Sequence, residues 1–332
     1  MMEIKDTTQA VSAPGIVLAL GGGGAAGLAH IGVLQVLNEE GIAVRAVVGS
    51  SIGAEIGAFL AIGMPIDELA AMATAFDWKK TLQLFLPDLP TGGLISGVRI
   101  VDFLNSWLGK QQIEELGMGY AAIATDLVSG EQVVLDRGDL VEAVRASISV
   151  PGVIAPYADS ERWLVDGAVV NPLPFDVARA RFGGPVVAVS TGTRHTQPPS
   201  TEISLPSPQW PKRIRQLLDQ AWMARAPVLR EWLESQVERV ERATPRTKPY
   251  WTTRRVLDRV LGIAEAEIIR LRSMTNPPDL LLTPAINGIG LLEFYRAREA
   301  IESGRQAARD ALPQLRALQS AGPTPVDYNH NR

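Results

Sequence analysis

The stretch GGGGAAGLAHIGVL, residues Gly21–Leu34, joins a short apolar run to a segment with helical periodicity. The run before it, Gly15–Leu20, is continuously apolar and bounded by glycine, which is typical of a strand buried on both faces. A second such run, Ala43–Gly49, and a second helical segment, Ala54–Gly63, come directly after it. This alternation of strand and helix predicts parallel strands joined by right-handed crossovers.

The rest of the chain continues the alternation. Asp67 is positioned to cap a helix that runs to Trp78, and another amphipathic helix ends near Leu108. Two β-rich runs in Tyr120–Leu135, on either side of Ser129-Gly130, predict a hairpin. Further strands are expected at 162–170, 184–193 and 279–284, and a last helix at about 291–311. The fold class is therefore α/β, with a mostly parallel central sheet.

Composition limits the function classes. The chain has 332 residues, of which 46% are hydrophobic, and its formal net charge of −4 gives no basic field for nucleic acid. It has no cysteine, which excludes disulfides, thiol catalysis and cysteine-bound zinc. No cluster of His, Asp and Glu has ligand spacing, so we expect neither a metal nor a cofactor. With no signal sequence and no apolar run of about 18 residues, we expect a cytoplasmic protein that can lie at a membrane surface.

Residues 206–275 differ in character from the flanking α/β pattern. They hold 14 Lys and Arg against 8 Asp and Glu, and four of the seven tryptophans. We expect a helical insertion within a catalytic domain of residues 15–320, between a flexible segment 1–14 and a disordered tail 321–332. Amphipathic helices with basic flanks and tryptophan suit a lipid interface, and they also suit a lid or a subunit contact in an oligomer.

The glycine-rich loop has a cofactor interpretation that its context disfavours. Gly22, Gly24 and Gly27 match the dinucleotide fingerprint after a strand and before a helix. That fingerprint needs an acidic residue at the end of the next strand, and the sequence there is VVGSS. A phosphate-binding P-loop would need Gly-Lys-Ser/Thr, which is also missing.

The next strand ends instead in GSSIG, residues Gly49–Gly53. Gly-x-Ser-x-Gly between a strand and a helix is the pattern of a nucleophile elbow, in which a sharp turn lifts the Ser51 hydroxyl clear of the sheet. Parallel strands bring this turn and the glycine loop to the same sheet edge. The N–H groups of Gly23 and Gly24 can then converge on the oxygen that becomes negative when Ser51 attacks an ester.

Two residues compete as the base for Ser51. Asp166, in VDGAVV, is held on a tight Asp-Gly turn at a strand end and can act directly. Alternatively, Ser51, Asp166 and His195 have the chain order of an α/β-hydrolase triad, although that fold places its elbow later in the sheet. His30, inside the first helix, is interpreted as a structural residue.

Taken together, the segments GGGGAAGLAHIGVL, GSSIGA, ATDLVSG, RASISVPGVIAPY, VDGAVVNPLP and GLLEFYRAREAIESG resemble the patatin-like phospholipases, most closely their short bacterial branch. The resemblance implies a three-layer α/β/α fold and a Ser–Asp dyad that hydrolyses acyl esters of lipids. It makes Ser51 the nucleophile, Asp166 the base and Gly22, Gly23 and Gly24 the oxyanion hole. Supporting turns would come from Gly27, Gly49, Gly53 and Gly167.

The chain departs from the family at one position. Ala26 stands where the family usually has Arg or Lys, so a cation that would support the loop or meet a phosphate is missing. This leaves open an alternative of another class, a non-catalytic lipid-binding or regulatory protein.

Overall fold

The computed structural model describes residues 15–77, 81, 84–85, 93–159, 162–192, 218, 230–231, 233–235, 253–286 and 288–320. Its chain divides into two compact units, residues 1–194 with 262–332, and residues 195–261. The expectations for the two termini and for most of the 206–275 insertion lie outside the described residues. Every named strand belongs to the first unit.

An eight-stranded sheet forms the centre of this unit. Its order is β5-β6-β3-β2-β1-β7-β8, and β4 also pairs with β3. The pairs β1–β2, β1–β7, β2–β3 and β7–β8 are parallel, as predicted, while β4, β5 and β6 pair antiparallel. The strands are β1 (Ile16–Leu20), β2 (Val44–Ser50), β3 (Gly119–Asp126), β4 (Gln132–Leu135), β5 (Tyr157–Asp159), β6 (Arg162–Asp166), β7 (Val186–Val189) and β8 (Leu280–Leu282).

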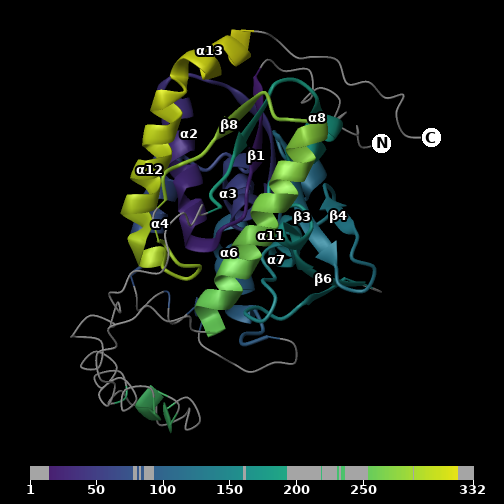
Figure 1. The fold of residues 1–332 in the computed structure, drawn as a ribbon, viewed down its shortest axis with the longest axis vertical. Helices are drawn as coiled ribbons and strands as arrows, with labels where there is room; N and C mark the ends of the chain where they lie inside the picture. The colour runs from purple at the N-terminus through teal and green to yellow at the C-terminus, as the bar shows by residue number, and fades with distance from the viewer. Residues whose placement is uncertain are drawn as a thin grey trace. The chain divides into compact units, whose positions relative to one another are not determined.

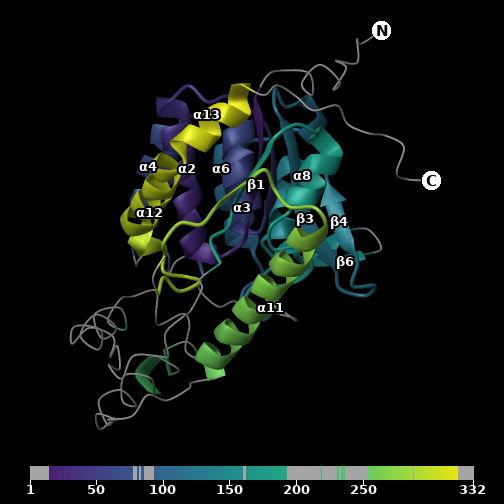
Figure 2. The same cartoon turned by 45° about the horizontal axis from the view of Figure 1, so that its top comes forward.

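Helices cover both faces of the sheet, which makes three layers (Figure 1). Alternate strand residues contact opposite layers: Leu18 and Val47 pack toward α2, α3, α4 and α12, whereas Val17 and Ala46 pack toward α8 and α11. Figure 2 shows the same sandwich from another side. The α-helices are α2 (Ala29–Glu39), α3 (Ile52–Ala61), α4 (Ile66–Thr74), α6 (Val98–Leu108), α7 (Leu140–Ser147), α8 (Phe175–Phe182), α11 (Thr253–Thr275), α12 (Ala297–Asp310) and α13 (Leu312–Ser320). The 3-10 turns are η1 (Gly24–Leu28), η2 (Ile113–Glu115), η3 (Gly167–Val169) and η5 (Phe294–Arg296).

The predicted Asp67 cap is wrong. Pro65 occupies the N-cap position with extended backbone geometry, and Asp67 lies in the first turn of α4 without a capping bond. The helix also ends at Thr74, before the expected Trp78. Because proline fixes its own φ near the helical value and needs no N–H partner, it starts the helix two residues earlier than a polar cap would.

Strand pairing brings two distant segments end to end. Ile123 of β3 pairs with Ser50 of β2, and the next residue, Ala124, pairs with Asp166 of β6. Since β4 pairs with these two β3 residues from the other edge, β2 and β6 occupy the same edge of β3 in succession. β2 runs parallel to β3 and β6 runs antiparallel, so their carboxyl ends meet there. Ser51 and Asp166 therefore become neighbours.

Glycines at this junction allow backbone segments to approach one another. A Cβ on Gly53 would lie 2.2 Å from the carbonyl oxygen of Leu20, and a Cβ on Gly27 would lie 2.1 Å from the Ile52 side chain. Both distances are far below van der Waals contact, so a larger residue would force the first turn of α3 away from β1 and the glycine loop. Gly49 and Gly167 are equally confined, with backbone atoms 2.3 and 2.2 Å from a Cβ.

We predict that Gly53→Ala destabilises the fold by about 3 kcal/mol or more, because the added methyl overlaps the β1 backbone. Urea unfolding monitored by circular dichroism measures the loss. Gly117→Ala is the matched control, because Gly117 is exposed and a Cβ there would meet nothing within 4 Å. The free energy of unfolding of this variant should stay within about 0.5 kcal/mol of the parent value. Equal stability of the two variants would contradict the packing argument.

Candidate active site

Ser51 occupies a strained turn between β2 and α3. Among the described residues it is the one non-glycine residue with positive φ, at φ 56° and ψ −128°. Its N–H donates to Ser147 Oγ at 3.0 Å, and Ser147 in turn donates to the Ile123 carbonyl at 2.6 Å. This strained geometry, held by a hydrogen-bonded neighbour, is what the Gly-x-Ser-x-Gly pattern predicts for an elbow.

The Asp166 carboxylate lies directly against the Ser51 hydroxyl. Ser51 Oγ donates to Asp166 Oδ2 at 2.5 Å, while Asp166 Oδ1 accepts from the Ala168 N–H at 2.8 Å. Only 5% of Ser51 and 3% of Asp166 is exposed. Burial raises the pKa of the Asp166 carboxyl to about 6, and the two hydrogen bonds oppose that rise. A carboxylate with a pKa near 6 accepts a proton more readily than an exposed one.

Hydrogen bonds hold the glycine loop on both sides of the Gly23 and Gly24 amides. His30 Nε2 lies 2.8 Å from the Gly21 carbonyl, Thr191 Oγ1 donates to the Gly22 carbonyl at 2.5 Å, and the Ala25 N–H donates to Leu291. Gly23 and Gly24 adopt φ of 140° and 56°, and their N–H groups have no partner among the described residues. Preorganised N–H donors of this kind can stabilise a negatively charged oxygen.

Gly22 lies at the site but differs from its two neighbours. Its N–H already donates to the Pro172 carbonyl at 3.0 Å, so this amide is not available as the third oxyanion donor implied by the family resemblance. A Cβ on Gly22 would lie 3.1 Å from Ala168 Cβ and 3.4 Å from Ser51 Cβ. Gly22 therefore leaves space beside the Ser51 hydroxyl, because it has no side chain.

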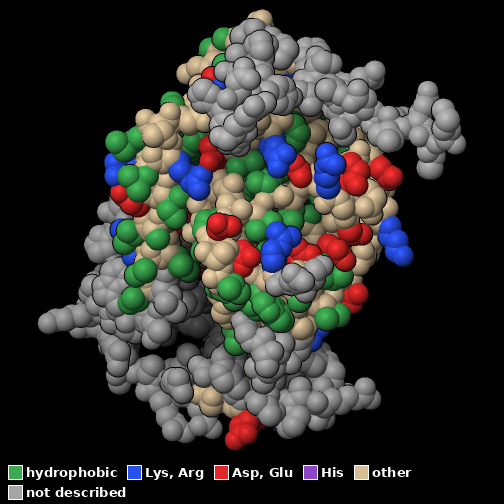
Figure 3. All heavy atoms as spheres, turned by 90° about the vertical axis from the view of Figure 1, so that its right-hand side faces the viewer, with side chains coloured by type: hydrophobic (Ala, Val, Ile, Leu, Met, Phe, Trp, Pro, Cys, Tyr) green, Lys and Arg blue, Asp and Glu red, His purple; other side chains and the backbone are tan. Residues whose placement is uncertain are grey.

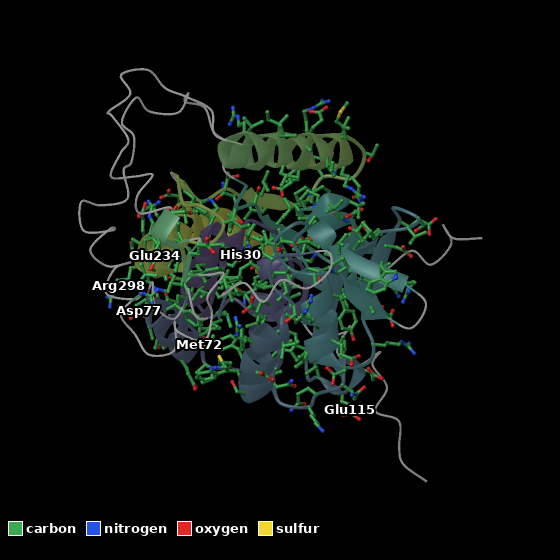
Figure 4. The ribbon with its side chains drawn as sticks, turned by 90° about the horizontal axis from the view of Figure 1, so that it is seen from below. His30, Met72, Asp77, Glu115, Glu234 and Arg298 are labelled. Carbon is green, nitrogen blue, oxygen red and sulfur yellow. The ribbon has the colours of Figure 1, made fainter. Side chains whose placement is uncertain are left out.

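The histidines fall in different places. His30, labelled in Figure 4, is fully buried in α2, and burial lowers its pKa to about 4, so the ring is neutral. Its bond to the glycine loop fits the structural role expected of it. His195 lies outside the described residues, which leaves the triad interpretation without a structural test.

An apolar pocket opens beside Ser51. Side chains from α2, α3, α4 and α6 and from the loops 148–154 and 291–294 line it. They include Ile56, Phe59, Met72, Phe103 and Phe294. A pocket with this lining accommodates a hydrocarbon chain, with the Ser51 hydroxyl on its wall.

Sequence reasoning missed several residues that shape this site. Arg145 of α7 is buried and donates to the carbonyls of Ser96 and Ala155, which join the segments before α6 and after α7. Thr125 donates to the Asp166 carbonyl at 2.9 Å. The sequence signal that could have found them is a polar residue within an apolar segment, as in RASISVP, because a buried polar group requires a hydrogen-bond partner.

The surface carries charges of both signs. Figure 3 shows one face, on which hydrophobic side chains lie among acidic and basic ones rather than in a field of one sign.

Three further observations concern Ala26, metal ligands and membrane spans. Ala26 is buried in η1, two residues after Gly24, and the Gly23 and Gly24 amides belong to the backbone and do not depend on its side chain. Over the described ranges, no three His, Asp or Glu side chains gather as metal ligands, and every helix is too short or too polar to span a bilayer.

Comparison with known proteins identifies the family. A family model described as patatin-like phospholipase matches residues 18–179. An uncharacterized NTE family protein of Mycobacterium tuberculosis is 33% identical, over 91% of this chain and 92% of that protein. The chain therefore belongs to the patatin-like phospholipase family, and its three-layer α/β/α architecture is the patatin fold.

Other relatives are longer than this chain. Patatin-like phospholipase domain-containing protein 6 of Mus musculus is 34% identical, and the aligned region covers 54% of this chain and 14% of that protein. Among solved structures, VipD of Legionella pneumophila aligns with a TM-score of 0.43 at 13% identity, over 91% of this chain and 67% of that one.

Proposed function

We propose that the protein is a serine hydrolase that cleaves fatty-acyl esters of lipids, as a phospholipase, lysophospholipase or less specific lipid acyl hydrolase. The observation that carries the proposal is the 2.5 Å contact between Ser51 Oγ and Asp166 Oδ2, beside an apolar pocket and two amides that no described residue pairs with. Family membership supports the same reaction class.

In the first step of the proposed mechanism, Asp166 takes the Ser51 proton as Oγ attacks the ester carbonyl carbon. The Gly23 and Gly24 amides stabilise the resulting oxyanion, and the helix dipole of α3, which begins at Ile52, adds to this stabilisation. The tetrahedral intermediate collapses, and the leaving alcohol receives the proton from Asp166.

In the second step, Asp166 takes a proton from water, and the oxygen attacks the acyl-enzyme. Collapse returns the proton to Ser51 and releases the fatty acid, so that one ester and one water yield one acid and one alcohol. The direct contact supports a dyad over a triad, because a triad histidine would stand between the hydroxyl and the carboxylate.

We predict that Ser51→Ala and Asp166→Asn each lower kcat/KM on p-nitrophenyl acyl esters by about a thousandfold or more, because each removes one half of the proposed dyad. Hydrolysis is monitored by p-nitrophenolate absorbance. Near-parent turnover in either variant would overturn the dyad. His195→Ala is the control: it should remain active, and abolished activity at unchanged stability would favour the triad.

We also propose that α11 contributes to peripheral membrane contact. In its portion from Gly262 to Thr275, Ile263, Leu271 and Met274 are exposed, and Arg270 is exposed among them. Exposed apolar residues on a helix favour the boundary between head groups and acyl chains, and here they surround an ion pair between Arg270 and Glu267. This agrees with the basic, tryptophan-containing character of residues 206–275.

We predict that the protein co-sediments with phosphatidylcholine vesicles, and more strongly when they contain phosphatidylglycerol. The double variant Ile263→Glu/Met274→Glu should bind several-fold less, because it places charge in the apolar boundary. Val128→Glu changes an apolar residue in the β3–β4 turn that is more exposed than either of these, and this variant should bind like the parent. Absent co-sedimentation, or equal loss in both variants, would count against docking through α11.

A further inference from the structure

The pocket beside Ser51 contains one carboxyl group in an otherwise apolar wall. Apart from Ser51, Gly24 and Glu55, each described residue that lines it is Leu, Ile, Val, Ala, Met or Phe. An ionisable side chain in such surroundings is costly unless it has a partner. The proposed dyad mechanism gives Glu55 no role.

Glu55 lies one helical turn from the nucleophile. The Glu55 N–H donates to the Ser51 carbonyl at 3.2 Å, and both side chains face the same pocket. Ser51 is the N-cap residue of α3 and Glu55 lies in the first turn of that helix, so the two side chains leave the helix at the same end. The carboxyl of Glu55 therefore lies close to the place where the first carbons of a bound acyl chain would pass.

The Glu55 carboxyl has no hydrogen-bond partner among the described residues. A titratable neighbour, Tyr120 of β3, donates its hydroxyl hydrogen to the Ala54 carbonyl at 2.9 Å instead. Burial among apolar side chains raises the pKa of Glu55 to about 7. A neutral carboxyl offers both a donor and an acceptor, and because Glu55 is partly exposed, solvent is the partner that a bound ligand would replace.

We propose that Glu55 determines acyl specificity, selecting ester substrates whose acyl chain carries a hydroxyl group near its carbonyl end. The inference rests on the proposed lipid ester hydrolysis and names its substrate class. The hydroxyl would pair with the Glu55 carboxyl while the rest of the chain fills the apolar pocket.

A hydroxyl suits this site better than the other groups that an acyl chain could present. An unsubstituted acyl chain would exclude water from the Glu55 carboxyl without offering it a hydrogen bond. Binding of such a chain is therefore disfavoured. An ammonium group would find one carboxylate and an apolar wall, with no further acceptors for its remaining protons. A hydroxyl pairs with the neutral and the ionised carboxyl alike.

The test is a competition between monoacylglycerols of 3-hydroxydodecanoic and dodecanoic acid in one mixture, with both released acids quantified by mass spectrometry. The ratio of products at low conversion equals the ratio of kcat/KM values. We expect the parent protein to prefer the 3-hydroxyacyl ester by about tenfold, the effect of one hydrogen bond to an otherwise unpaired group. A 12-hydroxydodecanoyl ester, with its hydroxyl at the far end, should gain no preference.

Two variants link the preference to Glu55. Glu55→Gln keeps a donor and an acceptor and should retain the preference, whereas Glu55→Met has similar length without polar atoms and should lose it. An equal ratio in the parent and in Glu55→Met would overturn the proposal. So would equal hydrolysis of the two esters by the parent, a result that needs no variant to fold. If the parent hydrolyses neither ester, the proposed function itself fails instead.

Discussion

The site depends on the succession of β2 and β6 along one edge of β3. Ser50 and Asp166 pair with adjacent β3 residues, Ile123 and Ala124, from strands that run in opposite directions. Two chain segments separated by more than a hundred residues thus end at the same point, and the turn after Ser50 places the Ser51 hydroxyl against the carboxylate. The glycines around this junction permit the close approach, because a Cβ on Gly53 would overlap the β1 backbone.

The same junction sets the chemistry of its groups. Burial makes the charged form of Asp166 less favourable, while hydrogen bonds from Ser51 and Ala168 keep it within reach of neutral pH. The glycine loop is fixed by His30 and Thr191, so in the proposed mechanism the Gly23 and Gly24 amides are held in place for an oxyanion. This arrangement supports acyl-ester chemistry without requiring the cation that Ala26 replaces.

The sequence was sufficient for the parallel αβ core, because apolar runs such as Gly15–Leu20 and the GSSIG turn have strong local signatures. It could not supply strand register, on which the contact between Ser51 and Asp166 depends, and it could not say that the Gly22 amide already has a partner. Asp67 was misjudged because a nearby proline set the helix start. Glu55 and Arg145 were missed, since their importance lies in tertiary surroundings that a linear pattern does not encode.

The most direct test of the account is the rate at which a fluorophosphonate modifies the protein, measured by mass spectrometry across pH. In the proposed mechanism Asp166 can act as a base only when it is deprotonated, and burial raises its pKa to about 6. The account predicts an adduct on Ser51 whose rate of formation falls as the pH falls through about 6. The absence of an adduct on Ser51, or a rate that stays constant down to pH values near 4, where an ordinary aspartate titrates, would contradict it.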